Sequence, residues 1–220
     1  MFSSNLWRKL FGGIFNPLLA DETGLVAIGG DLSPKNLLKA YCSGVFPWFG
    51  EQDPVMWWSP DPRAIFELDG MHVSRRLERT IRSRRFRITM DRDFGGVIRG
   101  CADREEGTWI TQEMLEAYET LHRLGYAHSV EAWADEKLAG GIYGVAIGGF
   151  FAGESMFTRE RDASKVALAS LLARLRERDF FLFDIQFATD HTRRLGAIEI
   201  ARSDYLQRLR EALAHKVTFR

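Results

Sequence analysis

The sequence predicts a mixed α/β protein, in which a small N-terminal domain precedes a larger domain built on a central, largely antiparallel sheet. The 220 residues, 45% hydrophobic and 27% charged, suffice for a sizeable core and exclude a disordered chain. Residues 1–62 are rich in Gly, Pro and Trp, whereas strand-like and helix-like patterns alternate from residue 63 onward. These observations predict two domains, residues 1–62 and 63–220.

The N-terminal domain is expected to contain one clear helix, from Pro34 to Ser43. Ser33 is suited to the N-cap, Pro34 to the first helical position, and Gly44 to the stop. The following segment, FPWFGEQDPVMWWSPDP, contains too many prolines for a regular element.

The larger domain is expected to alternate helices with strands. Ser74 and Thr111 can each cap a helix, and Gly125 ends the second of these helices. The residues DEK read as a hairpin turn between two strands. We expect helices after Ser74 and at residues 111–124, 163–178 and 203–214, and strands at residues 85–90, 127–133, 138–147, 149–157 and 180–187.

Composition excludes several classes of protein. The 30 basic and 30 acidic side chains cancel, so net charge indicates neither a nucleic-acid nor a membrane partner. Two cysteines, Cys42 and Cys101, cannot form a disulfide-rich scaffold or a four-ligand zinc site. No stretch approaches the roughly 20 apolar residues of a membrane span, and the N-terminus lacks a small-residue cleavage site. We therefore expect a cytoplasmic protein without a membrane partner.

Positive charge is concentrated in HVSRRLERTIRSRRFR, residues 72–87, which holds seven arginines and one acid. Arg75, Arg79 and Arg82 fall on one face of the expected helix, a spacing suited to a phosphate backbone. A solvated helix face is the alternative. The tryptophans of the N-terminal domain favour nucleic-acid contact, because aromatic rings stack on unpaired bases.

Polar side chains interrupt two strands that should otherwise be buried. Glu154 lies in GESMF between two phenylalanines, and an unpaired buried carboxylate is costly. In FDIQF, alternation places Asp184 and Gln186 on one face, roughly 6.5–7 Å apart. A structural pair that bonds a neighbouring loop is the alternative. The combination of the two strands favours a functional site.

Other chemistries find little support. The order Ser155, Asp184, His191 matches an α/β-hydrolase triad, but GESMF lacks the second glycine of G-x-S-x-G. The other histidines show no metal-ligand spacing, and neither a Walker loop nor G-x-G-x-x-G occurs. We expect no metal and no cofactor.

Eleven strings follow one another along the chain: GLVAIGGDLSP (24–34), GVFPWF (44–49), WWSPDPR (57–63), HVSRRL (72–77), EEGTWIT (105–111), HSVEAW (128–133), GGIYGVAIG (140–148), GESMF (153–157), ASKVAL (163–168), and DHT with LGAIEI (190–200). Taken together, they resemble the leucyl/phenylalanyl-tRNA–protein transferases. The ordered set spans about residues 24–205, which makes the resemblance specific.

The resemblance implies a C-terminal domain like that of the N-acetyltransferases (GNAT). It also implies an enzyme that moves Leu or Phe, with Met as a further candidate, from aminoacyl-tRNA to the N-terminal Arg or Lys of an acceptor protein. The added residue would create a degradation signal. The ester bond to tRNA is already activated, so the reaction requires neither ATP nor a metal.

The resemblance also implies roles for individual residues. Gln186 would contact the attacking amine, Asp184 would orient or polarise it, and Glu154 would help to bind the basic residue of the acceptor. Trp48 and Trp109 match tryptophans near the terminal adenosine. The implied donor side-chain pocket consists of Ile142, Phe151, Met156, Leu168, Leu171 and Phe183, and the implied contacts to the tRNA backbone are Arg75, Arg76, Arg79 and Arg82.

Two other functions stay open at this point. Another acetyltransferase-like enzyme could use acyl-CoA, or build peptidoglycan cross-bridges from aminoacyl-tRNA. The acyl-CoA version predicts a glycine-rich loop before the helix at residues 163–178, where this chain has TRERDASK. An RNA-binding module could use the arginines and tryptophans without needing Glu154, Asp184 and Gln186.

Overall fold

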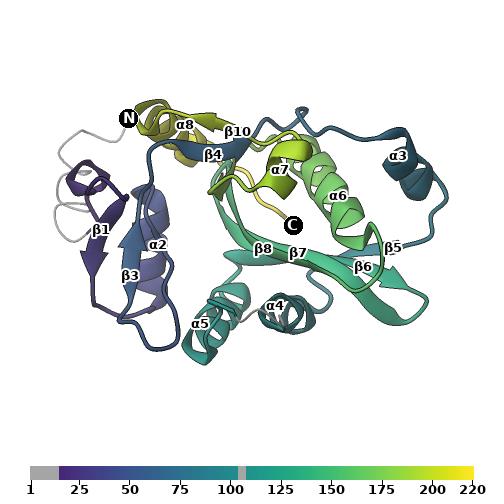
Figure 1. Cartoon of the computed structure of the whole chain (residues 1–220), viewed down its shortest axis with the longest axis horizontal. Helices are drawn as coiled ribbons and strands as arrows, with labels where there is room; N and C mark the ends of the chain where they lie inside the picture. The colour runs from purple at the N-terminus through teal and green to yellow at the C-terminus, as the bar shows by residue number, and fades with distance from the viewer. Residues whose placement is uncertain (1–14, 104–107) are drawn as a thin grey trace.

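The computed structural model describes residues 15–103 and 108–220, which form two sheets flanked by helices (Figure 1). Two segments on which expectations rest lie outside these residues. They are residues 1–14, which open the expected N-terminal domain and bear on the expected absence of a secretory signal, and residues 105–107 of the string EEGTWIT.

The smaller sheet is built from the N-terminal part of the described chain. Its elements are the 3-10 helix η1 (Pro17–Leu19), β1 (Leu25–Ile28), α2 (Pro34–Cys42), β2 (Phe46–Pro47) and β3 (Met56–Trp58). The strand order is β1-β3-β2 and both pairs are antiparallel. The expected helix is confirmed, although it ends one residue early, and Gly44 follows it with φ of +77°.

The prediction that residues 46–62 contain no regular element was wrong, because β2 and β3 lie within them. These strands have two and three residues, which is too short for a periodic pattern to be visible. Pro47 is tolerated because β2 is an edge strand, where one missing N–H breaks no inner ladder.

Within the described residues, the larger sheet contains seven strands in the order β10-β4-β9-β8-β7-β6-β5. Its strands are β4 (Arg63–Phe66), β5 (Arg87–Met90), β6 (Ala127–Ala134), β7 (Lys137–Ile147), β8 (Phe150–Thr158), β9 (Leu182–Gln186) and β10 (Ile198–Ile200). Every neighbouring pair is antiparallel except β8 with β9. The predicted mixed, largely antiparallel sheet is therefore confirmed.

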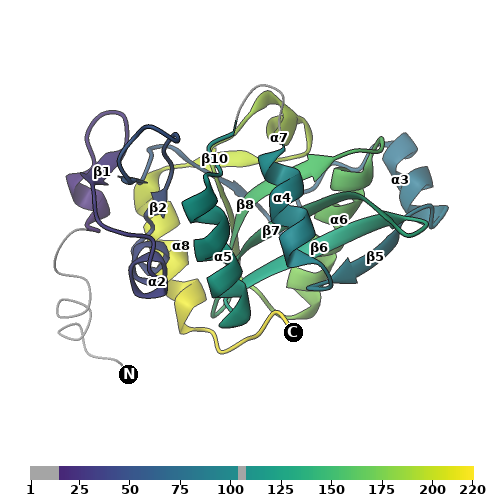
Figure 2. The same ribbon diagram turned by 90° about the horizontal axis from the view of Figure 1, so that it is seen from below.

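Helices cover both faces of the larger sheet. They are α3 (Arg75–Arg82), α4 (Phe94–Ala102), α5 (Gln112–Arg123), α6 (Ala163–Glu177), α7 (Asp190–Arg194) and α8 (Arg202–Ala214). Figure 2 shows α4 and α5 on one face, with α6 on the other. Tyr41 of α2 and Tyr118 of α5 belong to one hydrophobic cluster, so the two sheets share a core. The domain division at residue 62 stays a prediction.

Side chains of serine and threonine begin two predicted helices as expected. The Ser74 hydroxyl accepts from the Leu77 amide at 3.2 Å, and the Thr111 hydroxyl accepts from the Met114 amide at 3.3 Å. Such caps satisfy amide groups that the helix itself leaves without partners.

Helix α4 was not predicted, because its three glycines have low helix propensity. Gly100 is required by packing, since a Cβ there would lie 2.8 Å from the Phe157 ring. The sequence also did not predict β1, β4, α7 or β10, all of five residues or fewer.

The parallel pair of strands positions the site. β8 and β9 are paired from Phe150 with Leu182 as far as Ala152 with Asp184. Beyond this point the ladder between them ends, while β8 continues to Thr158 and β9 to Gln186. The space between the diverging strand ends holds a cavity.

Candidate active site

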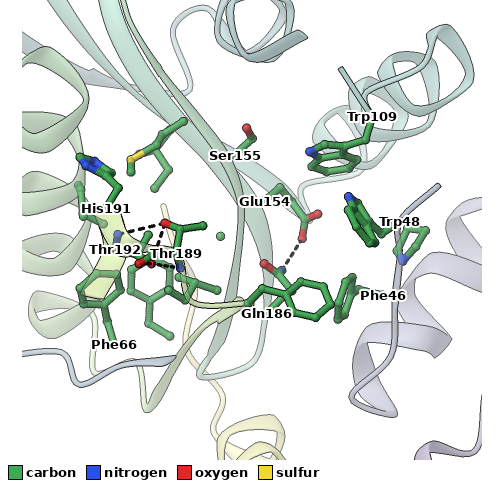
Figure 3. A pocket seen from close by; sticks show the side chains of 18 residues that line it. Phe46, Trp48, Phe66, Trp109, Glu154, Ser155, Gln186, Thr189, His191 and Thr192 are labelled. Atoms are coloured by element: carbon green, nitrogen blue, oxygen red, sulfur yellow. Dashed lines mark hydrogen bonds between the residues drawn. The ribbon is translucent and has the colours of Figure 1, made fainter. Parts of the chain in front are cut away.

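A cavity of about 390 Å³ lies between the diverging ends of β8 and β9 (Figure 3). This volume is in the range of small-molecule binding pockets. Its lining comes from both sheets and consists of Phe46, Pro47, Trp48, Phe66, Trp109, Ile142, Gly153, Glu154, Ser155, Met156, Leu168, Phe183, Ile185, Gln186, Phe187, Thr189, His191 and Thr192.

A β-bulge in β8 delivers a carboxylate to this cavity. Ser155 is paired with Tyr143 and Gly153 with Gly144, so Glu154 is an extra residue in β8. A bulge re-aims the side chains that follow it, because it interrupts the alternation between the two faces. Glu154 can therefore line the cavity although it interrupts an apolar strand.

A second bulge lies in β9. Asp184 is paired with Ile65 and Gln186 with Ala64, which leaves Ile185 as the extra residue. Gln186 itself has φ of +60°, in the left-handed region that non-glycine residues rarely adopt. Such backbone strain persists only where surrounding contacts enforce it. Gln186 lines the cavity, whereas Asp184 does not.

Hydrogen bonds hold the Glu154 carboxylate from two sides. Gln186 Nε2 donates to Glu154 Oε1 at 3.2 Å, as Figure 3 shows, and the Tyr118 hydroxyl donates to Glu154 Oε2 at 3.1 Å. The Tyr118 hydroxyl is also bonded to that of Tyr41, at 2.5 Å. Tyr41 on helix α2, beside the smaller sheet, thus supports the carboxylate of Glu154 on β8 of the larger sheet through Tyr118.

The pKa of Glu154 is raised to about 7. Removal from water is the largest cause, since it disfavours the charged form. The hydroxyls of Tyr41 and Tyr118 act in the opposite direction, and the charge of Asp184 raises the pKa further. The side chain is partly exposed, so an incoming cation can reach it.

This raised pKa predicts a pH-dependent effect of Glu154→Gln on stability. Between pH 4.5 and about 7 the folded chain keeps a proton that the unfolded chain releases, so this group's contribution to stability falls as pH rises through that window. Removing the carboxyl should therefore stabilise the protein at pH 8, by up to about 3 kcal/mol, and have little effect at pH 4.5. Urea unfolding at both pH values measures this. The exposed Glu113→Gln controls for the lost charge, and equal effects of Glu154→Gln at both values would contradict the account.

Asp184 is buried behind the cavity in an ion pair with Arg63, and the two side chains are 0% and 1% exposed. Arg63 Nε and Nη2 donate to the two carboxylate oxygens at 2.8 and 2.7 Å. The Tyr205 hydroxyl donates to Asp184 Oδ2 at 3.0 Å, and the backbone N–H of Gln186 donates to Asp184 Oδ1 at 2.9 Å. Asp184 therefore holds the backbone of Gln186.

This arrangement corrects the expectation that Asp184 and Gln186 lie on one face of the strand. Regular alternation would have placed the Asp184 side chain beside that of Gln186, but the bulge at Ile185 separates the two side chains. Asp184 does not line the cavity, and its side chain contacts the backbone N–H of Gln186, so its expected role in the reaction stays a prediction.

Four of the six expected donor-pocket residues line the cavity: Ile142, Met156, Leu168 and Phe183. The other two, Phe151 and Leu171, do not, and each is at most 1% exposed. Phe151 packs against the rings of Phe180, Phe183 and Phe219. It therefore supports the cavity wall from behind, and Leu171 belongs to the same core cluster.

Both expected adenosine-binding tryptophans line the cavity. Figure 3 shows Trp48 and Trp109 beside the Glu154 carboxylate, and His191 at the opposite end. Trp48 is 43% exposed, and its ring is tilted against Phe187 at 5.7 Å. A large indole surface is thus available at one end of the cavity.

The four expected phosphate-binding arginines lie on α3, and none of them lines the cavity. Arg75 and Arg79 are exposed. Arg82 is paired with Glu78 at 2.6 Å. Arg76 is paired at 2.9 Å with the buried Asp162, so it also has a structural role that the sequence did not reveal.

Sequence reasoning missed the residues that support the site from behind, which are Arg63, Tyr205, Tyr118 and Tyr41. An arginine at the start of a strand is a weak signal, and a tyrosine on the apolar face of a helix reads as core. Arg63 stood in the string WWSPDPR without an assigned role. The sequence pattern relates His191 only to a hydrolase triad, and the structure places it at the cavity.

The helices of the described residues include none that is both long and apolar enough to cross a membrane.

Comparison with known proteins identifies the family. The profile of the leucyl/phenylalanyl-tRNA protein transferase family matches residues 65–210, and that of its N-terminal domain matches residues 30–61. A leucyl/phenylalanyl-tRNA–protein transferase from Anaeromyxobacter sp. (strain Fw109-5) is 54% identical over 202 residues, which cover 90% of this chain and 86% of the relative. The enzyme of the same name from Solidesulfovibrio magneticus is 53% identical over 201 residues, covering 90% and 81%.

Among solved structures, a GCN5-related N-acetyltransferase-like protein from Streptococcus suis is similar with a TM-score of 0.38 and 14% identity, over 75% of this chain and 63% of that one. The family assignment depends on the sequence comparisons alone. Since the family profile covers well over half of the chain, and relatives above 50% identity cover most of it, the chain belongs to the leucyl/phenylalanyl-tRNA protein transferase family.

Proposed function

We propose that this protein transfers Leu or Phe, with Met as a further candidate, from aminoacyl-tRNA to the N-terminal Arg or Lys of acceptor proteins. The reaction would take place in the cavity between β8 and β9, in the cytoplasm, and would mark the acceptor for degradation. The observation that carries the proposal is the combination of an apolar pocket with Glu154 and Gln186 in one cavity, in a chain of this family.

The donor side chain would enter the apolar part of the cavity. Ile142, Met156, Leu168 and Phe183 form a wall without charges, which favours an apolar side chain over a polar one. One methylene in such a pocket is worth only about 1–3 kcal/mol. The preference among Leu, Phe and Met would therefore depend on small differences in shape.

The acceptor amine would meet the ester near Gln186. The side-chain Nε2 of Gln186 donates to Glu154, which leaves the side-chain amide oxygen of Gln186 oriented to accept an N–H of the amine. An α-amino group has a pKa near 8, so a useful fraction is neutral at physiological pH. The amine nitrogen forms a bond to the ester carbonyl carbon, the bond to the tRNA oxygen breaks, and the amine proton balances the charge on that leaving oxygen.

Glu154 would bind the positive charge of the acceptor's N-terminal residue. A nearby cation lowers the pKa of a carboxyl group, so binding would ionise Glu154 even though its pKa is about 7 in the free protein. This explains how an acidic group in a largely apolar cavity could select a basic side chain.

Substitution of either cavity tryptophan should weaken donor binding. Trp109→Ala is expected to raise the KM for aminoacyl-tRNA about tenfold with a smaller effect on kcat, because stacking is worth about 1–3 kcal/mol per base. Trp109→Phe keeps an aromatic face and should recover part of the affinity. Steady-state kinetics with varied Phe-tRNA measures both, and an unchanged KM in Trp109→Ala would remove the indole from the donor site.

Helix α3 would bind the tRNA backbone through Arg75 and Arg79, which are its exposed arginines without an ion pair within the described residues. Arg76 is a poor choice for a test, because removing it would also leave Asp162 short of a partner. Phosphate contacts would fix orientation without reading the anticodon.

The direct test is to incubate the protein with labelled Leu-tRNA or Phe-tRNA and a model protein that begins with Arg, Lys, Asp or Met. Label on the Arg and Lys acceptors alone supports the proposal. Label on Asp would keep the transfer reaction and overturn the proposed acceptor. Label on no acceptor while tRNA still binds would favour an RNA-binding module.

A further inference from the structure

The cavity and helix α3 are connected by a surface on α6 and α7. Leu168 of α6 lines the cavity together with His191 and Thr192 of α7, so both helices border it. Lys165 precedes Leu168 by three residues and falls on the same helix face. Burial, and then the charges of Lys165 and Arg194, lower the pKa of His191, which is consistent with both cations lying close to this end of the cavity.

The same surface continues from α6 to α3. The Asp162 carboxylate, 6% exposed, receives Arg76 Nη2 at 2.9 Å and Lys165 Nζ at 3.6 Å. Two cations on one carboxylate leave a net positive charge. Arg75 and Arg79 then extend the positive surface along α3. Figure 1 shows α7, α6 and α3 on the same side of the larger sheet.

Most acidic groups on or near α3, α6 and α7 in the described residues are already paired. The pairs are Glu78 with Arg82, Glu160 with Arg85, and Glu199 with Arg193. Asp190 at the start of α7 is exposed and is the remaining acid on that helix. Arg194 is exposed and has no ion pair within the described parts of the chain. The surface therefore carries an excess of positive charge between the cavity and α3.

We propose that Lys165 and Arg194 bind phosphates of the unpaired 3′ end of the donor tRNA, between the terminal adenosine in the cavity and the part of the tRNA held on α3. This inference rests on the proposed transfer function. It assigns to α6 and α7 a contact that neither the cavity tryptophans nor the α3 arginines provide. Phosphate contacts fix the position of a nucleic acid on a protein. Cations at this position would therefore fix the path of the flexible 3′ end of the tRNA and hold the ester in the cavity.

Three donor substrates with different numbers of phosphates can distinguish contacts in the cavity, contacts on α6 and α7, and contacts on α3. They are the phenylalanyl ester of adenosine, without phosphate; that of the trinucleotide CCA, with two internucleotide phosphates; and Phe-tRNA. Arg194→Ala should leave kcat/KM for the adenosine ester unchanged and lower it about three- to tenfold for the CCA ester and for Phe-tRNA. The salt dependence with both of these donors should become less steep by about 0.7 for each phosphate that the variant no longer binds.

Adding Lys165→Ala to Arg194→Ala should enlarge the loss in kcat/KM with the same pattern across the three donors. Thermal unfolding of the double variant checks that the fold tolerates the loss of one partner of Asp162. Arg75→Ala with Arg79→Ala should lower kcat/KM for Phe-tRNA alone. Arg210→Ala is a matched control, because this exposed arginine lies on α8 at a separate cavity with Phe15 and Cys42. It should leave all three donors unchanged.

Two results would overturn the inference. An equal loss with the adenosine ester would show that Arg194 acts in the cavity rather than on phosphate, and unchanged kinetics with the CCA ester would remove α7 from the path of the strand. Absence of transfer by the unmodified protein from every donor would instead refute the proposed function.

Discussion

Gln186→Asn is expected to lower kcat for transfer about 100-fold while the KM for aminoacyl-tRNA changes little. Gln186 links the Glu154 carboxylate to the position proposed for the attacking amine, and the loss of one positioned polar group in an active site costs about 10²–10³ in kcat. Asparagine keeps the amide and tolerates the left-handed backbone at φ +60°, but it is one methylene too short for the 3.2 Å contact.

This choice of variant separates chemistry from folding. Gln186→Ala would lose the amide and also place alanine in a strained conformation. Gln112→Ala, on the first turn of α5, is the matched control for loss of a glutamine and should retain full activity. If Gln186→Asn transferred Phe at a rate within threefold of the unmodified protein, the proposed role of this side chain would have to be abandoned.

The second large effect is expected for stability. Asp184→Ala should destabilise the fold by about 3–5 kcal/mol, because it leaves the buried Arg63 guanidinium without its carboxylate. That is a large fraction of the 5–15 kcal/mol typical of a domain. The same change removes the acceptor of the Gln186 backbone N–H, so transfer activity should fall even under conditions in which the variant stays folded.

Equilibrium unfolding in urea measures this effect. Glu78→Ala is the matched control, because it breaks an ion pair whose side chains are 77% and 49% exposed and should cost less than about 1 kcal/mol. The double variant Arg63→Met with Asp184→Leu should recover part of the loss, since an apolar pair leaves no buried charge. A loss below 1 kcal/mol in Asp184→Ala would show that Arg63 finds other partners.

The long elements and the main site residues could be predicted because their signals are local. Helix α5 is readable from a capping threonine and from Met114, Tyr118 and Leu121 on one face, all of which are fully buried. Glu154 and Gln186 stood out because polar groups interrupt apolar strands. Both line the cavity and are hydrogen bonded to each other.

Which of the polar side chains line the cavity and which lie behind it could not be predicted, because this depends on irregular strand geometry. Alternation puts Asp184 and Gln186 on one face, and only the bulge at Ile185 separates them. The bulge at Glu154 is equally invisible in the sequence. Bulges depend on pairing with strands distant in the chain, which composition and periodicity do not reveal.

Long-range partners were missed for a similar reason. Tyr41 and Tyr118 are separated by 77 residues, and Arg63 and Asp184 by 121, so no local pattern links them. Helix α4 shows the opposite case, in which local propensity argued against a helix that tertiary packing stabilises. Gly100, which weakens the helix, is the residue that lets Phe157 approach it.

A crystal structure with a stable amide analogue of phenylalanyl-adenosine would show directly whether the cavity between β8 and β9 binds the donor. We expect the phenyl group against Met156 and Leu168, the adenine at Trp48 and Trp109, and the carbonyl within hydrogen-bonding reach of Gln186. Binding of the analogue in the cavity beside α8, or with the phenyl group outside the space between β8 and β9, would contradict this expectation.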